Sequence, residues 1–278
     1  MNDNPNRKGR APARHYDPYS GKDRPELSDD ETDDRIEGKN AVTEALRAGR
    51  TIDKVFIARG EKDASLSHIA SLAKQAGIVV AEADKRKLDA MSQTGAHQGV
   101  IAMAAVTAYV EIDDILEIAK SRAEPPLIVI CDEISDPHNV GAIIRTAECV
   151  GAHGVIIPKR RNAGMTAVVS KTSAGAVEHM AIARVANITS AIEKLKKAGV
   201  WVYGASSEGN GQLWQSDLTG AAAIVIGSEG EGLGRLVSEN CDFMIRIPMV
   251  GKISSLNASV SASVILYEAF RQRSAGAF

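Results

Sequence analysis

The chain has 278 residues, of which 44% are hydrophobic and 24% are charged, and its formal net charge at pH 7 is −2. This length suits one large or two modest globular domains. The longest apolar runs, such as residues 127–131 and 221–226, are too short to cross a membrane, and the polar start lacks the apolar core of a signal peptide. We therefore expect a cytoplasmic protein without a membrane span.

The three cysteines, Cys131, Cys149 and Cys241, are widely spaced and lie in apolar surroundings. This odd number and spacing indicate buried, reduced thiols rather than disulfides or zinc ligands. No metal site is readable in the sequence.

Residues 1–37 are polar, basic early and acidic later, with seven Lys or Arg residues and ten Asp or Glu residues. Such a segment cannot bury enough apolar surface to offset chain entropy, so we expect a disordered tail.

The rest of the chain has a net charge of +1. RNA contacts would then come from local basic clusters, for which the candidates are Lys159, Arg160 and Arg161, and residues 85–87. Solvated surface charge is the alternative for both clusters.

Residues 38–105 predict a small α/β domain. Helical patterns cover residues 41–46, 64–76 and 85–91, and strand patterns cover residues 52–58, 78–81 and 100–104. Residues 106–126 predict a linker, because they combine an acidic amphipathic helix around residues 111–120 with the rigid pair Pro125 and Pro126.

Residues 127–278 alternate strand and helix patterns at the short spacing of a parallel sheet. Strands are predicted at residues 127–131, 154–157, 180–185, 200–204, 222–226 and 243–247. Helices are predicted at residues 140–150, 167–172, 189–198, 233–239 and 257–271. We therefore expect a wound α/β sheet whose ligand lies beyond the carboxyl ends of the strands.

The segment DPHNVGAIIRTA, residues 136–147, lies between the first predicted strand and helix of this sheet. Asn139 suits a helix N-cap, and Arg145 on its apolar stripe could merely extend its charge to solvent. A catalytic role is the alternative for each of them.

A second motif, GSEGEGLG at residues 227–234, follows the strand predicted at 222–226. Gly227 lets the backbone approach a small ligand closely, because no Cβ blocks the approach. Glu229 could hold the loop by accepting backbone amides, or it could bind substrate hydroxyls and guide Arg145. The glycine spacing does not match a dinucleotide-binding fold, which disfavours a dehydrogenase.

A third motif combines IPM at residues 247–249 with SSLNASV at residues 254–260. In order and spacing, the three motifs closely resemble those of the SpoU (TrmH) family of S-adenosylmethionine-dependent RNA ribose 2′-O-methyltransferases. The resemblance covers residues 127–271. Residues 38–105, with GKNAV at the start and HQGV near the end, resemble the L30e-like substrate-binding domain of the RlmB-type 23S rRNA guanosine methyltransferases.

The resemblance implies an α/β fold with a knotted, parallel-sheet SPOUT methyltransferase domain, a deep trefoil knot and a homodimer. It implies that S-adenosylmethionine is bound in the knot. The cofactor-binding residues that it implies are Gly227, Ile247, Met249 and Leu256. The catalytic and substrate-binding residues that it implies are Arg145, Asn139, Glu229, Ser255 and Asn257.

The implied reaction is methylation of the ribose 2′-hydroxyl of a guanosine in 23S rRNA. A tRNA or another rRNA nucleotide is the alternative substrate. A noncatalytic RNA-binding ribosome assembly factor is the alternative from another class of protein. Aromatic residues make up only 4% of the chain, so an extended base-stacking platform is not expected.

Overall fold

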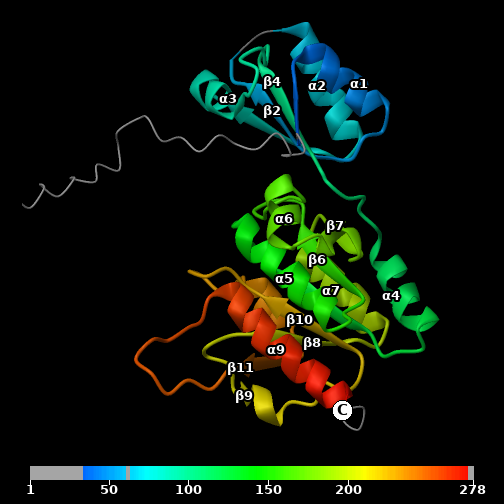
Figure 1. Ribbon diagram of the computed structural model, residues 1–278, viewed down its shortest axis with the longest axis vertical. Helices are drawn as coiled ribbons and strands as arrows, with labels where there is room; N and C mark the ends of the chain where they lie inside the picture. The colour runs from blue at the N-terminus through cyan, green and yellow to red at the C-terminus, as the bar shows by residue number, and fades with distance from the viewer. Residues whose placement is uncertain (1–33, 61–62, 275–278) are drawn as a thin grey trace, which may run out of the picture. The chain divides into compact units, whose positions relative to one another are not determined.

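The computed structural model describes residues 34–60 and 63–274, whose strands form two separate sheets (Figure 1). The N-terminal sheet has the strand order β1-β4-β2-β3. Its strands are β1 (Arg35–Glu37), β2 (Ile52–Ala58), β3 (Val79–Ala83) and β4 (Val100–Ala104). Helices α1 (Lys39–Arg47) and α2 (Ala64–Gln75) bury their apolar sides against one face of this sheet, and α3 (Lys85–Met91) packs on the other face.

The first strand lies inside the segment that we expected to be a disordered tail. Arg35–Glu37 pairs antiparallel with β4, and Ile36 is buried in the core of the small domain. A strand of three residues shows no periodicity, and its pairing partner lies far along the chain, so local patterns could not reveal it. The rest of the predicted tail, residues 1–33, lies outside the described residues.

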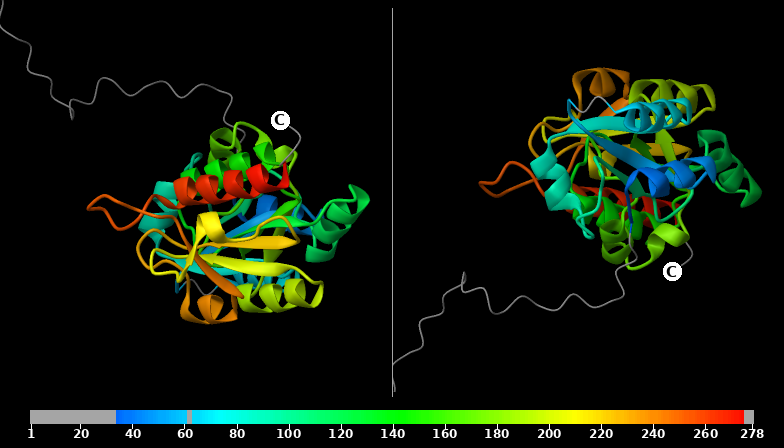
Figure 2. Two further views of the ribbon diagram at one scale, coloured as in Figure 1. Left: turned by 90° about the horizontal axis from the view of Figure 1, so that it is seen from below. Right: turned by 90° about the horizontal axis from the view of Figure 1, so that it is seen from above.

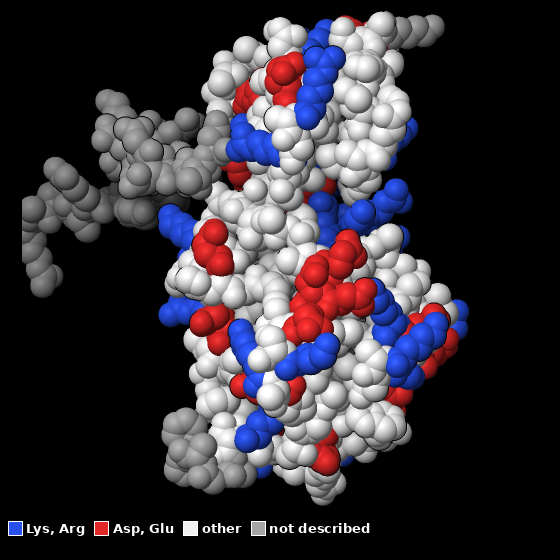
Figure 3. Space-filling model, turned by 90° about the vertical axis from the view of Figure 1, so that its right-hand side faces the viewer, with Lys and Arg blue, Asp and Glu red and all other residues white. Residues whose placement is uncertain are grey.

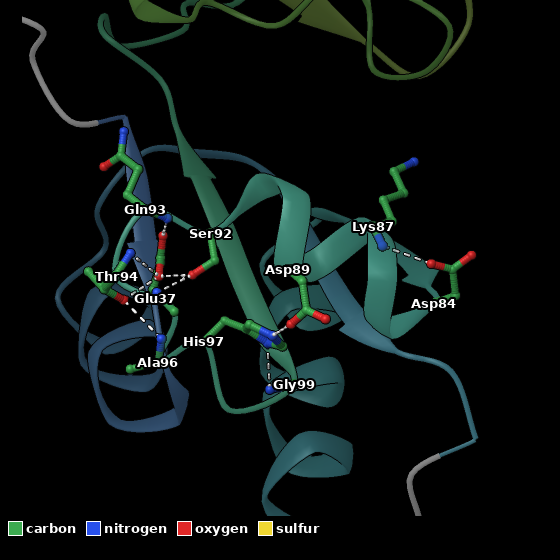
Figure 4. A network of polar contacts seen from close by, with 11 residues as sticks. Glu37, Asp84, Lys87, Asp89, Ser92, Gln93, Thr94, Ala96, His97 and Gly99 are labelled. Carbon is green, nitrogen blue, oxygen red and sulfur yellow. Dashed lines mark hydrogen bonds and ion pairs between the residues drawn. The ribbon is translucent and has the colours of Figure 1, made fainter. Parts of the chain in front are cut away.

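The Glu37 carboxylate holds the loop that follows α3 (Figure 4). It accepts hydrogen bonds from the Ser92 and Thr94 hydroxyls and from the Gln93 and Thr94 backbone amides. Burial would raise the pKa of Glu37, but these four hydrogen bonds favour the ionised form and lower the pKa to about 2.

The second sheet has seven strands in the order β7-β6-β5-β10-β8-β11-β9, and its strand pairs are parallel, as predicted. The strands are β5 (Leu127–Cys131), β6 (Gly154–Pro158), β7 (Ile182–Val185), β8 (Trp201–Ala205), β9 (Gly211–Gln212), β10 (Ala222–Ile226) and β11 (Phe243–Arg246). The helices are α4 (Ile112–Ser121), α5 (Pro137–Cys149), α6 (Ala167–Thr172), α7 (Ile188–Lys197), α8 (Arg235–Asn240) and α9 (Ala258–Arg273). Two short 3₁₀ turns, Ala176–Glu178 and Leu213–Gln215, complete the elements.

Helices cover both faces of the seven-stranded sheet. Alternate residues of β5 point into two separate apolar cores, because successive side chains of a strand face opposite ways. One core contains the buried faces of α5, α6 and α9, and the other contains those of α4, α7 and α8. Figures 1 and 2 show α5 beside α9 on one of these faces. This is the wound α/β arrangement that the sequence predicts.

Helix α4 occupies the middle of the segment predicted as a linker. Ile112, Ile115 and Ala119 are buried, and the two isoleucines belong to the core that α7 and α8 share. The acidic amphipathic pattern therefore describes a helix whose apolar side packs on the second sheet.

The expectation of three buried thiols is wrong for Cys149, which is exposed at the end of α5. Cys131 is buried and Cys241 is partly buried.

Among the described residues, 34–60 and 63–274, no helix is long and apolar enough to span a bilayer. Within the same described part of the chain, no cluster of His, Cys, Asp and Glu side chains could hold a metal ion. Figure 3 shows one face of the molecule, where Lys and Arg side chains are interspersed with Asp and Glu.

Candidate active site

A cavity of about 580 Å³ lies at the carboxyl ends of β8, β10 and β11. Small-molecule sites in proteins generally measure about 300–1,000 Å³. The loops after these three strands, residues 254–256 and the first turns of α9 line it. The cavity is therefore at the edge of the sheet where the strand pattern predicts a ligand.

Six of the residues predicted for the site line this cavity. They are Gly227, Glu229, Ile247, Met249, Ser255 and Leu256. Met249 and Leu256 are 40% and 37% exposed, so both present apolar surface that a ligand could cover.

The glycine turn after β10 closes tightly on itself. Backbone hydrogen bonds of 3.0 Å join Ser228 and Gly232 in both directions. A Cβ on Gly227 would lie 2.2 Å from the carbonyl carbon of Gly232 and 2.5 Å from the nitrogen of Leu233. Since both clashing groups are backbone, only glycine allows the turn to close at this point.

Asp132 ties the end of β5 to the same turn, although the sequence analysis did not select it. Its side chain is buried, and Oδ2 accepts a hydrogen bond of 2.8 Å from the Gly234 backbone amide. Burial raises the pKa of Asp132, and the bond from Gly234 opposes that rise. Asp132 thus anchors the C-terminal end of the turn that forms one wall of the cavity.

Asn139, Glu229 and Asn257 form an amide–carboxylate cluster beside the cavity. Asn139 donates from Nδ2 to Glu229 Oε1 at 3.1 Å, and Asn257 Nδ2 donates to Asn139 Oδ1 at 3.0 Å and to Glu229 Oε1. The structure therefore brings together one residue from each of the three sequence motifs. Glu229 holds side-chain amides here rather than the backbone amides that the sequence suggested.

The orientation of the Asn257 amide follows from its position at the N-terminus of α9. Its Oδ1 accepts hydrogen bonds from the backbone amides of Ser259, at 2.9 Å, and Val260, at 3.2 Å. Because the oxygen caps the helix, the Nδ2 group must point into the cluster.

Asn139 does not cap a helix. Asp136 is the N-cap of α5 and accepts the His138 backbone amide at 2.9 Å, whereas Asn139 lies inside the helix and is buried. The proline at the first helical position supports this start, because its missing N–H would have no partner there.

Arg145 and Ser255 are separate from the cluster. Arg145 is exposed on α5, and no residue in the described part of the chain makes a hydrogen bond or ion pair with its guanidinium. Ser255 is also exposed and lines the cavity. The expected guidance of Arg145 by Glu229 is thus not present as a direct contact in the described chain.

The predicted basic cluster follows β6. Arg161 pairs with Glu133 at 2.9 Å, and Lys159 donates to the Gly77 carbonyl at 3.4 Å, whereas Arg160 is exposed. An RNA role for these side chains stays a prediction.

Carboxylates dominate the charged lining of the cavity. Besides Glu229 they are Glu208, Glu231 and Glu239; Arg235 is the basic member, and it pairs with Glu239 at 2.6 Å. The sequence analysis missed Glu208, which lies in the glycine- and serine-rich loop SSEGNG directly after β8. The position of that loop after a predicted strand was the signal that could have found it.

Two family models match the chain. The model of the SpoU rRNA Methylase family matches residues 126–267, and the model described as RNA 2′-O ribose methyltransferase substrate binding matches residues 35–109. Together they cover both sheets, and the first contains the cavity and all three motifs.

Similar proteins agree with these matches. YacO of Bacillus subtilis (strain 168), named for the TrmH family of tRNA/rRNA methyltransferases, is 45% identical over 86% of this chain and 96% of its own. A protein of Staphylococcus aureus (strain MSSA476) with the same family name is 44% identical over 86% of this chain and 96% of its own. The fold is similar to that of the SpoU methyltransferase AviRb from Streptomyces viridochromogenes, whose crystal structure contains AdoMet. The two sequences are 26% identical, the TM-score is 0.55, and the match covers 87% of this chain and 91% of the AviRb chain.

Proposed function

Because this chain belongs to the SpoU rRNA Methylase family, we propose that it transfers a methyl group from S-adenosylmethionine to the ribose 2′-hydroxyl of a guanosine in 23S rRNA. The chain is an RNA 2′-O-methyltransferase by family. Our proposal adds to this family activity that the substrate is a guanosine of 23S rRNA and that the enzyme acts in the cytoplasm. The observation that carries the proposal is the amide–carboxylate cluster beside a cavity walled by the glycine turn.

The cavity fits the cofactor in shape and charge. The turn that Gly227 allows to close forms one wall, and the apolar side chains of Ile247, Met249 and Leu256 offer surface for an adenine ring. The carboxylates of the lining suit ribose hydroxyls and a positively charged ligand. When bound, S-adenosylmethionine supplies an electrophilic methyl group on a sulfonium.

The residues of the chain must align the ribose oxygen with that methyl group. They must also stabilise the negative charge that develops on the oxygen as its proton leaves. We assign the stabilisation of this charge to Arg145, because its guanidinium is positively charged and has no partner among the described side chains. It positions an RNA phosphate and stabilises the developing alkoxide, and the proton leaves through that phosphate or water. Asn139 and Glu229 orient the ribose.

Substitution of Arg145 tests this assignment. Arg145→Ala should abolish methyl transfer while the affinity for S-adenosylmethionine, measured by calorimetry, stays unchanged, since Arg145 does not line the cavity. Arg145→Lys should recover only part of the rate, because an ammonium lacks the planar fork that grips phosphate at two points. Undiminished turnover by Arg145→Ala would remove it from the mechanism.

The substrate nucleotide requires its own experiment. Tritiated methyl transfer from S-adenosylmethionine into 23S rRNA and into bulk tRNA, both from a strain lacking this gene, should label the rRNA. Resistance to alkaline cleavage, which a 2′-O-methyl group confers, should then map to one guanosine. Label in tRNA alone would favour the alternative substrate, which the tRNA/rRNA names of the relatives keep open.

We also propose that the enzyme acts as a homodimer with the knot that the family resemblance implies. Val260 and Tyr267 on α9 are 46% and 53% exposed, and Val168 on α6 is 42% exposed, so this side of the second sheet carries apolar side chains at the surface. Burial of such groups favours association. Light scattering coupled to gel filtration should give twice the 29.4 kDa mass of the chain; the mass of a single chain would contradict the proposal.

A further inference from the structure

One face of the small domain gathers two lysines around a single aromatic ring. Lys54 on β2 lies with its Nζ 5.0 Å from the ring centroid of Phe56, and Lys87 on α3 lies with its Nζ 5.3 Å from the same centroid. Both distances are within the range of cation–π attraction. We refer to Lys54, Phe56 and Lys87 as the lysine–phenylalanine site.

The fold explains why these side chains meet. Lys54 and Phe56 are two residues apart on β2, so they share a face of the sheet. Helix α3 packs on that face through Leu88, which leaves the neighbouring Lys87 at its rim. Figure 4 shows the Lys87 side chain extending away from Asp84, whose carboxylate instead accepts the Lys87 backbone amide at 2.8 Å.

The residues of β3 and β4 that are paired with Lys54 and Phe56 carry no charge. Lys54 is opposite Val79 on β3 and Met103 on β4, and both are apolar. Phe56 is opposite Ala81 and Ile101, which are also apolar.

Neither lysine has an acidic partner within the described residues. Of the nearest carboxylates in sequence, Glu82 pairs with Arg59 at 3.5 Å and Asp89 contacts His97 at 3.0 Å.

The charges of Lys87 and Arg184 both repel the Lys54 ammonium. Its pKa is lowered first by burial and then by the charges of Lys87 and Arg184. Two ammonium groups held over one ring repel each other, and the ring offsets only part of that repulsion. An anion placed between them would relieve the repulsion.

We propose that the lysine–phenylalanine site binds a phosphate of the substrate RNA. The inference rests on the proposed function, because it takes RNA as the substrate, and it adds where the small domain holds that RNA. One phosphodiester carries the charge that two adjacent ammonium groups attract, and the Phe56 ring keeps both groups in place. The match of residues 35–109 to a substrate-binding family model supports RNA as the source of the phosphate.

The site differs from the basic cluster after β6. There Arg161 is already paired with Glu133, and Lys159 donates to a backbone carbonyl. Lys54 and Lys87 contact no acceptor among the described residues, so a phosphate there replaces no existing hydrogen bond. We therefore expect the lysine–phenylalanine site to contribute more to the salt dependence of RNA binding than this cluster.

A charge-matched pair of double variants tests the proposal. Binding of 23S rRNA made by in vitro transcription is measured by filter retention over a range of KCl concentrations. Lys54→Gln/Lys87→Gln should lower the slope of log affinity against log salt by about 1, since the site neutralises one phosphate and each neutralised phosphate contributes about 1. Lys74→Gln/Lys197→Gln, which removes two exposed lysines elsewhere, should leave the slope unchanged.

Two further measurements guard the interpretation. Both double variants should keep the melting temperature and the circular dichroism spectrum of the wild type, which shows that both domains are folded. Phe56→Leu should keep the salt slope, because both lysines remain, and should weaken binding less than the double lysine variant.

The results separate this inference from the proposed function. An unchanged slope in Lys54→Gln/Lys87→Gln, or an equal fall in the control, overturns the site even if the wild type methylates rRNA. Binding of inorganic phosphate that is lost in Lys54→Gln/Lys87→Gln, together with an unchanged salt slope for rRNA, would identify a free-phosphate site and also overturn the proposal. The predicted fall in slope in Lys54→Gln/Lys87→Gln, with a wild type that transfers no methyl group, would support the site and contradict the proposed function.

Discussion

Asn257 performs two tasks with the two ends of one side chain, and substitution can separate them. Its oxygen caps α9 through the Ser259 and Val260 amides, and its nitrogen donates to Asn139 and Glu229. Serine is an equally good N-cap but has no amide group to reach the cluster. Asn257→Ser therefore removes the donor alone, whereas Asn257→Ala removes the donor and the cap.

The structure sets the size of each effect. A hydrogen bond to a charged group contributes about 1.5–3 kcal/mol, so loss of the bond to Glu229 should lower kcat/KM about 10- to 150-fold if the bond is needed in the transition state. Asn257 and Glu229 are both exposed, so water can replace the bond in the resting enzyme and the stability of Asn257→Ser should change by less than about 1 kcal/mol. Loss of the cap in Asn257→Ala should cost about 1 kcal/mol more.

Methyl-transfer kinetics and thermal denaturation check the two effects separately. We expect Asn257→Ser and Asn257→Ala to be equally slow, and Asn257→Ala to melt about 2–4 °C lower, as about 1 kcal/mol does in a domain of this size. Full activity of Asn257→Ser would refute the role of the amide in the cluster. Equal melting temperatures for the two variants would refute the cap.

Three other outcomes follow from the structure. Gly227→Ala should abolish S-adenosylmethionine binding measured by calorimetry, because its Cβ would lie 2.2 Å from the backbone of Gly232; retained affinity would show that the turn can open. Asp132→Asn should weaken S-adenosylmethionine binding more than it slows kcat, since the charge-assisted bond to Gly234 holds the turn rather than the substrate; a fall in kcat alone would contradict this. The Glu37 carboxylate, whose pKa is about 2 in the folded chain against 4.5, stabilises the fold fully above pH 4.5 and loses this effect as the pH falls through 2. The wild type and Glu37→Gln should therefore differ in their free energy of unfolding, measured by urea titration, and this difference should disappear between pH 4.5 and pH 2. A difference that does not depend on pH would contradict the stabilising role of the ionised Glu37 carboxylate.

Local patterns predicted the larger elements well. The strands at residues 127–131 and 222–226 were predicted with the bounds that the structure has, because buried apolar runs between turn residues are a strong local signal. Two strands were missed, β1 of three residues and β9 of two. Such short strands exist through their hydrogen bonds to β4 and β11, which no local pattern contains.

The motifs predicted which residues belong to the site but not how each one acts. The sequence favoured a helix cap for Asn139 over a catalytic role, and the position of Asp136 as the N-cap of α5 excludes the cap. Asp132 carried no signal in the sequence, because its partner Gly234 lies on another segment of the chain.

The sequence by itself determined the order of the longer strands and helices, the parallel sheet and the three motifs, because these depend on residues close together in the chain. Only the tertiary structure decided that Asn139, Glu229 and Asn257 share hydrogen bonds, and that Lys54 and Lys87 meet over one ring without a carboxylate. The physical reason is that these contacts join segments far apart in sequence. Their geometry depends on how the sheets and helices pack, which the periodicity of a single segment does not record.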